Sequence, residues 1–156
     1  MTTTRLTQPV HDAITVFVRY ATELGEKAPY EFLPICDLLL AAYHSCPDLC
    51  DDLDWPKPPD LEYSEIRSEV QRAFPDYGLY NLPEHALTHI AESGVMVGDA
   101  LDDITDIVRD FRRILWCYDH TSEADAVWHF RIGYMSHWAR HVRDLQFYLI
   151  RLEEGD

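Results

Sequence analysis

Apolar residues recur every three or four positions along most of the chain, a spacing that predicts helices and leaves almost no strand signal. In the first third of the chain this pattern predicts two helices, over residues 9–24 and 30–45. Pro9 and Pro34 suit the first turns, where a missing N–H is tolerated, and Gly25 suits the end of the first helix.

The next segment interrupts the helical pattern. Residues 46–60 contain four prolines and five acidic residues, a composition that cannot sustain a helix. We expect an acidic, proline-rich surface loop that joins two helical halves rather than a boundary between domains. A chain of 156 residues also matches the usual size of a single domain, about 100–200 residues.

Further helices are predicted in the second half of the chain. They cover residues 61–73, 82–92, 95–117 and 122–152. Asn81 with Glu84 three residues later has the spacing of a capping box and marks the start of the second of these helices. The predicted fold class is therefore all-α, a bundle of five to six helices in a single domain that spans residues 1–156.

One predicted helix carries an unusual concentration of aspartates. The segment 95–117 places five of them at offsets of 0, 3, 4, 7 and 11 residues: Asp99, Asp102, Asp103, Asp106 and Asp110. At about 100° per residue all five fall within about 100° of arc, and we call them the Asp ridge. The opposite face of the same helix is apolar and belongs to the core.

Three interpretations of the Asp ridge stay open: a solvated face, an internal ion-pair network, or a set of metal-binding or catalytic carboxylates. Arg109 and Arg113 follow Asp106 and Asp110 by three residues, so they are expected to neutralise the C-terminal half of the ridge. Aspartate is a weaker helix former than glutamate, so its use here hints at a need for fixed geometry.

The last predicted helix supplies basic and aromatic side chains to face the Asp ridge. Arg131 lies on its apolar side, and we expect it to be buried and paired with the ridge, because an unpaired buried charge is costly. His137, Arg140 and His141 form a polar strip at helical spacing. The candidate site is a polar network between the last two long helices: Asp99, Asp102, Asp103, Asp106, Arg131, His137, Trp138, Arg140 and His141.

A metal site is the alternative interpretation of the same residues. His137 and His141 are four residues apart, so both imidazoles can share one helix face and one metal ion. The alternative cofactor is a divalent metal, and its ligand set is Asp102, Asp103, Asp106, His137 and His141. The chain contains no Glu-x-x-His, so the di-iron carboxylate pattern is absent.

Two further metal sets are weaker. His85 and His89 also stand four residues apart. A zinc set can be assembled from four more residues, although nothing in their spacing demands it: His44, Cys46, Cys50 and Cys117.

Composition limits the partners. The chain has 28 acidic and 13 basic residues and a formal net charge of −15. Nucleic acids and anionic membranes are bound by clustered Lys and Arg, so neither is an expected partner.

No apolar run approaches the roughly 20 residues of a membrane span, and the N-terminus lacks the pattern of a secretory signal. Four cysteines are few for a disulfide scaffold, so we expect reduced thiols and a cytoplasmic protein.

The two segments that carry the candidate site resemble a known family. The strings GDALDDITDIVRDF from residue 98 and ADAVWHFRIGYMSHWARHVRDL from residue 124 are similar to the bacterial family called domain of unknown function 5063. The positions that carry the resemblance are Asp102, Asp103, Asp106, Arg109, Asp110, Trp128, Arg131, His137, Trp138, Arg140 and His141. The chain departs from that pattern at Thr105, Val108 and Ala139, the last in place of a glycine. The resemblance implies a small helical bacterial protein and implies no activity.

A second resemblance concerns Arg131 and His137 alone. Their spacing is similar to the arginine-to-histidine signature of the HEPN superfamily of helical ribonucleases. Ile132 follows the arginine here, where that superfamily has a polar residue, and the acidic charge of the chain disfavours RNA.

No catalytic signature of another kind is present in the sequence. There is no GxSxG elbow, and no cysteine lies in an activating context. The expected function is therefore that of a non-catalytic interaction or accessory protein without a cofactor, whose Asp–Arg/His network is mainly structural. The alternative is a metal-binding protein or a metal-dependent helical enzyme. Whether the protein is an enzyme, which protein partner it has and its oligomeric state stay open.

Overall fold

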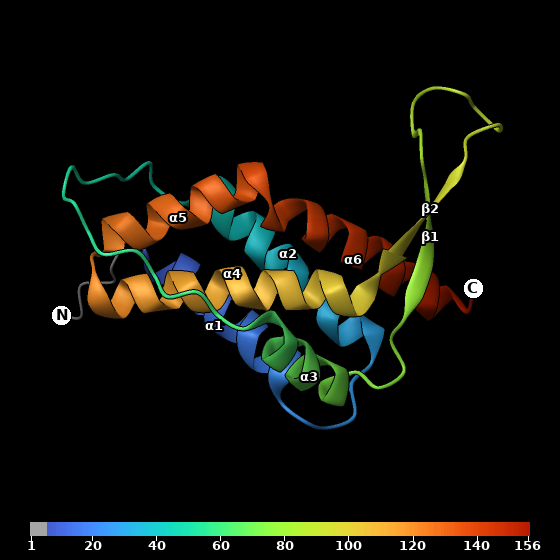
Figure 1. The fold of residues 1–156 in the computed structure, drawn as a ribbon, viewed down its shortest axis with the longest axis horizontal. Helices are drawn as coiled ribbons and strands as arrows, with labels where there is room; N and C mark the ends of the chain where they lie inside the picture. Colours follow the sequence, from blue (N-terminus) through green and yellow to red (C-terminus); the bar gives the residue numbers. More distant parts are fainter. Residues whose placement is uncertain (1–5) are drawn as a thin grey trace.

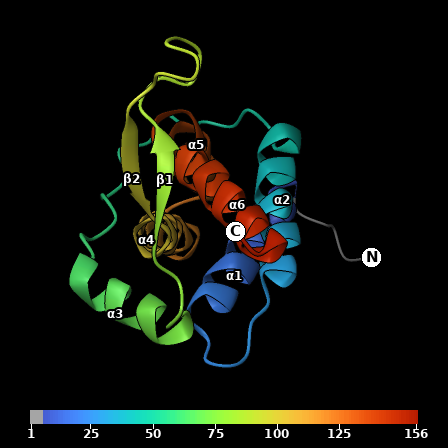
Figure 2. The ribbon, with the colours of Figure 1, turned by 90° about the vertical axis from the view of Figure 1, so that its right-hand side faces the viewer.

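The helix that carries the Asp ridge, α4 (Ala100–His120), runs through the middle of the molecule in the computed structural model, which describes residues 6–156. Four helices pack against it: α1 (Gln8–Thr22), α3 (Tyr63–Ala73), α5 (Glu123–Ser136) and α6 (Trp138–Glu154). The remaining helix, α2 (Pro29–Ser45), packs on α1 and α6, which lie between it and α4 (Figure 2). A two-stranded hairpin extends from one end of this bundle (Figure 1).

Aromatic rings join these helices at the centre of the bundle. Phe111 of α4 meets Phe17 of α1 edge-on, with ring centroids 5.6 Å apart, and lies 5.3 Å from the ring of Trp138 on α6. Phe32 of α2 packs on Phe17 at 5.3 Å. All four side chains are completely buried, and each such ring contributes about 1.5–3 kcal/mol by leaving water.

The predicted helices of the first half are confirmed, and so is the loop between them and α3. Residues 46–60 contain neither helix nor strand, and side chains anchor them to the bundle. The carboxylate of Asp51 accepts hydrogen bonds from Trp55 Nε1, at 2.9 Å, and from the hydroxyl of Ser122. Within residues 6–156, no helix combines the length and the apolar character needed to cross a membrane.

The predicted helix over 82–92 is wrong, and the fold is mostly helical rather than strictly all-α. The chain instead forms a hairpin in which β1 (Leu79–Pro83) pairs antiparallel with β2 (Val95–Asp99). The run Val-Met-Val at 95–97 favours a strand, and Gly98 leaves room for the ring of Tyr80 on the paired strand. A Cβ atom on Gly98 would lie only 2.4 Å from the Tyr80 ring. The ridge helix therefore begins at residue 100 instead of 95.

The predicted single helix over 122–152 is also wrong, because the chain breaks at His137 into α5 and α6. His137 has φ −151° and ψ −77°, outside the helical region. The next residue, Trp138, turns into the core and donates a hydrogen bond from Nε1 to the Phe130 carbonyl at 2.8 Å. Its indole covers Gly133, where a Cβ atom would lie 2.7 Å from Trp138 Cδ1. The break sets the direction of α6, which packs along α4.

Candidate metal centre between α4 and α6

His141 on α6 lies between two carboxylates of the Asp ridge. Its Nδ1 is 2.7 Å from Asp103 Oδ1, and its Nε2 is 3.5 Å from Asp106 Oδ2. The second oxygen of Asp103 accepts a hydrogen bond from the hydroxyl of Tyr80 on β1. Asp103 is a buried acid, so this hydroxyl and the imidazole provide the hydrogen bonds that a buried carboxylate requires.

His137, at the break between α5 and α6, has a similar contact about two helical turns further along the ridge. Its Nδ1 lies 2.7 Å from Asp110 Oδ2. The ring centroids of His137 and His141 are 4.8 Å apart, with the planes at 73°. Both imidazoles thus have the Nδ1 atom fixed by a carboxylate of α4, which leaves Nε2 as the nitrogen for a further ligand.

Asp106, His137 and His141 together offer three metal-donor atoms within 4.8 Å of one another. For metal bonds of about 2.0–2.1 Å, tetrahedral ligand atoms stand about 3.4 Å apart. The 3.5 Å between His141 Nε2 and Asp106 Oδ2 already meets this requirement. The side chain of His137 is 43% exposed, so it has room to rotate over the remaining distance.

The electrostatic field at this cluster favours a cation. The hydrogen bond to Asp103 is the largest cause of a raised pKa of His141, and burial opposes it. Burial, assisted by the negative charges of Asp102 and Asp110, raises the pKa of Asp106, while the neighbouring histidines lower it. Asp106 therefore holds its proton more tightly than an exposed aspartate, and a positive ion beside its carboxylate would favour the ionised form.

The N-terminal end of the Asp ridge has a different role. Asp99 caps α4 by accepting a hydrogen bond from the Leu101 N–H at 3.0 Å, and it pairs with Arg67 of α3 at 2.8 Å. Asp102 accepts a hydrogen bond from the hydroxyl of Tyr63, also on α3. These two aspartates thus join α3 to α4 and lie outside the group of three donor residues.

The predicted pairing of the ridge with arginines of its own helix is not what the structure shows. Asp106 and Asp110 pair with histidines, while the Nε atoms of Arg109 and Arg113 are buried without a hydrogen-bond partner. The arginines three residues further along α4 compete with histidines of the neighbouring chain segment for these carboxylates, and the histidines are the partners that the structure shows. The network is therefore mainly Asp–His across α4, α5 and α6.

Arg131 is likewise not a partner of the Asp ridge. It pairs with Asp48 of the loop 46–60, and its side chain is 31% exposed, because α5 presents it to that loop rather than to α4. Arg131 and His137 therefore bind different carboxylates. They do not form one site, as the resemblance to the HEPN signature would require.

Two other predicted site residues, Trp138 and Arg140, lie outside the group of metal donors. Trp138 is buried in the core and fixes the helix break. Arg140 is exposed, and its Nε stands 3.8 Å from Asp144, one turn along α6. The contributions of Tyr63, Arg67 and Tyr80 were not predicted, since no local pattern connects residues on α3 or β1 with the ridge.

The other two predicted sets of metal ligands do not form as the sequence predicts. Of the predicted zinc set, only Cys117 belongs to a cluster of donors in the part of the chain that the structure describes, and its partners are Asp125 and His129. The rings of His85 and His89 are 4.8 Å apart in the loop at the tip of the hairpin, where both are exposed.

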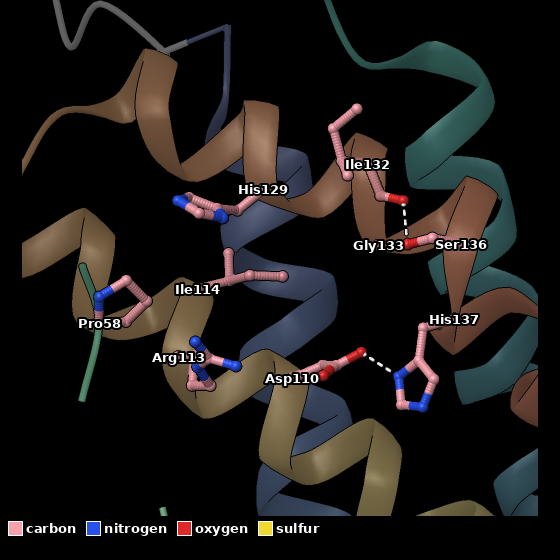
Figure 3. Close-up of a pocket in the computed structure, with 9 residues that line it drawn as sticks. All are labelled: Pro58, Asp110, Arg113, Ile114, His129, Ile132, Gly133, Ser136 and His137. Atoms are coloured by element: carbon pink, nitrogen blue, oxygen red, sulfur yellow. Dashed lines mark hydrogen bonds and ion pairs between the residues drawn. The ribbon is translucent and has the colours of Figure 1, made fainter. Parts of the chain in front are cut away.

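A cavity of about 220 Å³ lies between α4 and α5, beside the Asp110–His137 pair. Figure 3 shows Arg113 and His129 farther along the same cavity, with Ile114 and Ile132 on its walls. The cavity thus brings the end of the Asp–His network close to the residues around His129.

Two comparisons relate this chain to known proteins. A crystal structure of protein BF1032 from Bacteroides fragilis has the same fold, with a TM-score of 0.64 and 12% sequence identity, over 95% of this chain and 89% of that one. No protein with curated annotation matches the sequence significantly. The family model of a domain of unknown function, DUF5063, matches residues 7–151, which include α4, α5 and nearly all of α6. The chain is a member of the DUF5063 family.

Proposed function

We propose that this protein binds a divalent transition-metal ion through Asp106, His137 and His141. One observation carries the proposal: each histidine has its Nδ1 held at 2.7 Å by a carboxylate that is not itself in the donor group. Histidines that bind metals almost always have the other nitrogen fixed in this way, because the carboxylate orients the ring and increases its basicity. Asp103 and Asp110 supply that support here.

The donor set selects among metals. Two imidazoles and one carboxylate suit zinc, iron and neighbouring transition metals, whereas magnesium and calcium prefer oxygen donors alone. Three protein ligands leave coordination positions for water or substrate, which is typical of catalytic rather than structural metal sites. His137 faces solvent, so such a position is accessible. The proposed activity is therefore metal-assisted chemistry on a small molecule at the open side of this site.

A second candidate function is metal-free and follows from the raised pKa of His141. A protonated His141 between Asp103 and Asp106 forms an ionic clamp that holds α6 on α4. The protein then acts as a non-catalytic interaction or accessory protein. The hairpin tip, where Leu87 is 91% exposed and Ile90 74% exposed, is its apolar surface for a protein partner.

The proposed location is the cytoplasm. All four cysteines are free thiols, and two of them, Cys36 and Cys117, are buried without forming a disulfide. Free cysteines are typical of a reducing compartment.

Metal titration of the purified full-length protein distinguishes the two functions. A metal at about 100 times its Kd adds about 2.7 kcal/mol, which for a chain of this size raises Tm by about 5–10 °C. We expect that shift with zinc or ferrous ions and not with magnesium. In a Cys117→Ser background, which removes the thiol of the second donor group, we expect His137→Ala and Asp106→Asn to abolish it. His85→Ala, which removes an exposed histidine of the hairpin tip, is the matched control. Wild-type protein that contains no metal and shows no shift would support the clamp instead.

A further inference from the structure

A second group of metal donors lies near the other end of α4. Cys117 of α4 and two residues of α5, Asp125 and His129, each offer a ligand atom, and these atoms lie within 4.8 Å of one another. We propose that these three residues form a separate metal site that prefers zinc and similar thiolate-binding ions. This proposal does not depend on the site at Asp106, because the two groups share no residue.

Local structure positions the two α5 ligands. Ser122 caps α5 by accepting a hydrogen bond from the Asp125 N–H at 3.0 Å, which fixes the first turn of the helix. His129 follows one turn later, and its Nε2 is 3.7 Å from Asp125 Oδ1. Thr121 donates a hydrogen bond to the other oxygen, Oδ2, at 2.7 Å. Asp125 is therefore oriented by a neighbouring hydroxyl, while Oδ1 stays on the side of the imidazole.

The third ligand sets the metal preference. Cys117 is completely buried, and burial together with the Asp125 charge raises the pKa of its thiol to about 11. A metal must therefore displace the thiol proton, and soft or borderline ions such as zinc do so far better than magnesium or manganese. One thiolate and one carboxylate would neutralise the two charges of a divalent ion, so the resulting buried group carries no net charge.

Burial lowers the pKa of His129, and the positive charge of Arg113 lowers it further, while the negative charge of Asp125 opposes both. The lowered pKa of His129 favours the neutral imidazole, which is the protonation state that coordinates a metal. Arg113 also offsets a small part of the raised pKa of the Cys117 thiol. The positive charge of Arg113 would repel a bound metal ion whose charge is not neutralised. The two anionic ligands already cancel the charge of a divalent ion, so this repulsion is small.

The three protein ligands leave a fourth position on the side of the loop 46–60. A cavity of about 280 Å³ there is bounded by the loop and by Asp125, Trp128 and His129. Zinc prefers four tetrahedral ligands, and a water molecule from this cavity completes the set. His129 also borders the cavity of Figure 3, so solvent reaches the site from two sides.

Cobalt(II) added to the reduced full-length protein tests the proposal, because a thiolate bound to cobalt gives a charge-transfer absorption that nitrogen and oxygen ligands do not. We expect a saturable band in the wild type. Cys117→Ser should remove it, and His129→Gln should weaken cobalt binding by more than about tenfold. Cys46→Ser removes a half-buried thiol outside this cavity and is the matched control, with an unchanged band. Asp106→Asn should also keep the band, which separates this site from the proposed function.

Two results would overturn the inference: no thiolate band in the reduced wild type, or a band that persists in Cys117→Ser. Circular dichroism of the metal-free variants shows whether each has folded. If Cys117→Ser does not fold, His129→Gln decides the question, since the side chain of His129 is 35% exposed and its replacement is compatible with the fold. Unchanged cobalt affinity in His129→Gln would then rule out the site.

Discussion

At the scale of single residues, Asp103 illustrates how one carboxylate serves both fold and site. Its two oxygens are engaged by Tyr80 and His141, so it connects the hairpin, α4 and α6. With both oxygens occupied, Asp103 is suited to orient a ligand rather than to bind the metal itself. The predicted ligand set that included Asp102 and Asp103 is therefore narrowed in our proposal to Asp106 with the two histidines.

Asp103→Asn should lower the affinity for the metal by about 10–100-fold, because an amide orients the imidazole of His141 less firmly and adds no negative charge. Isothermal titration with zinc measures the effect in a Cys117→Ser background, in which the second donor group has lost its thiol. Asp102→Asn is the matched control, since Asp102 lies on the same helix and binds Tyr63 outside the donor group. Equal losses in both variants would mean that the metal senses only the net charge of the ridge.

The raised pKa of His141 predicts how the metal-free protein responds to pH. A histidine whose pKa is higher in the folded state contributes stability that is complete below its unfolded value, near 6.5, and is lost as pH rises through the folded value. In the presence of a chelator, the free energy of unfolding should therefore fall above pH 6.5, as measured by urea denaturation. His141→Gln should flatten this part of the profile, and a slope that survives in the variant would assign it to another group.

At the scale of elements, the break between α5 and α6 determines where the histidines lie. Alanine is ordinarily about 1 kcal/mol better than glycine inside a helix, yet Gly133→Ala should destabilise the protein by about 1–3 kcal/mol, because the added methyl group meets the Trp138 ring. Chemical denaturation measures this, and metal affinity should fall with it. At Gly78 no atom lies within 4 Å of an added Cβ, so Gly78→Ala is the control and should be nearly neutral.

The same break explains how much of the structure the sequence could predict. The helical period correctly located α1, α2, α3 and most of α4, because each buries a stripe of its own side chains. The helical period continues past His137 and so predicts no break there. The end of α5 depends on the hydrogen bond from Trp138 to the Phe130 carbonyl, and the spacing of apolar residues carries no sign of that contact. The prediction for the hairpin residues was wrong for a similar reason. Asn81 and Glu84 have the spacing of a helix cap, whereas the pairing of β1 with β2 joins residues far apart in the sequence.

For the candidate site, the sequence identified the chemical groups but not their partners. Asp106, His137 and His141 were all among the predicted residues, because acidic and histidine positions recur at helical spacing. Which acid meets which base depends on how α6 crosses α4, and that follows from the break. Arg131 shows the consequence, because an arginine expected against the ridge lies instead against Asp48 of a proline-rich loop.

At the scale of the whole molecule, α4 connects the parts, and one of its links can be measured separately. Arg112 makes two hydrogen bonds to Glu69 of α3, at 2.9 and 2.6 Å, with both side chains about one-third exposed. Glu69→Gln should lower the free energy of unfolding by about 1 kcal/mol or less, because water screens a pair at this exposure. High salt should reduce the difference between variant and wild type, and an equal difference at low and high salt would contradict an ionic origin.

The hairpin is a second test at this scale, because it extends beyond the bundle while its base belongs to the site. Glu84 N–H donates to the Gly94 carbonyl at 2.8 Å, so a two-residue Asn-Gly turn can replace residues 85–93 between them. The free energy of unfolding and the metal affinity should change little, within about 0.5 kcal/mol, because the removed residues are almost all exposed. Tyr80→Phe, at the base of the hairpin, should instead weaken metal binding through Asp103. A large loss of stability on shortening the tip would show that the apolar side chains there serve the fold, whereas an unchanged fold leaves them free to contact a partner.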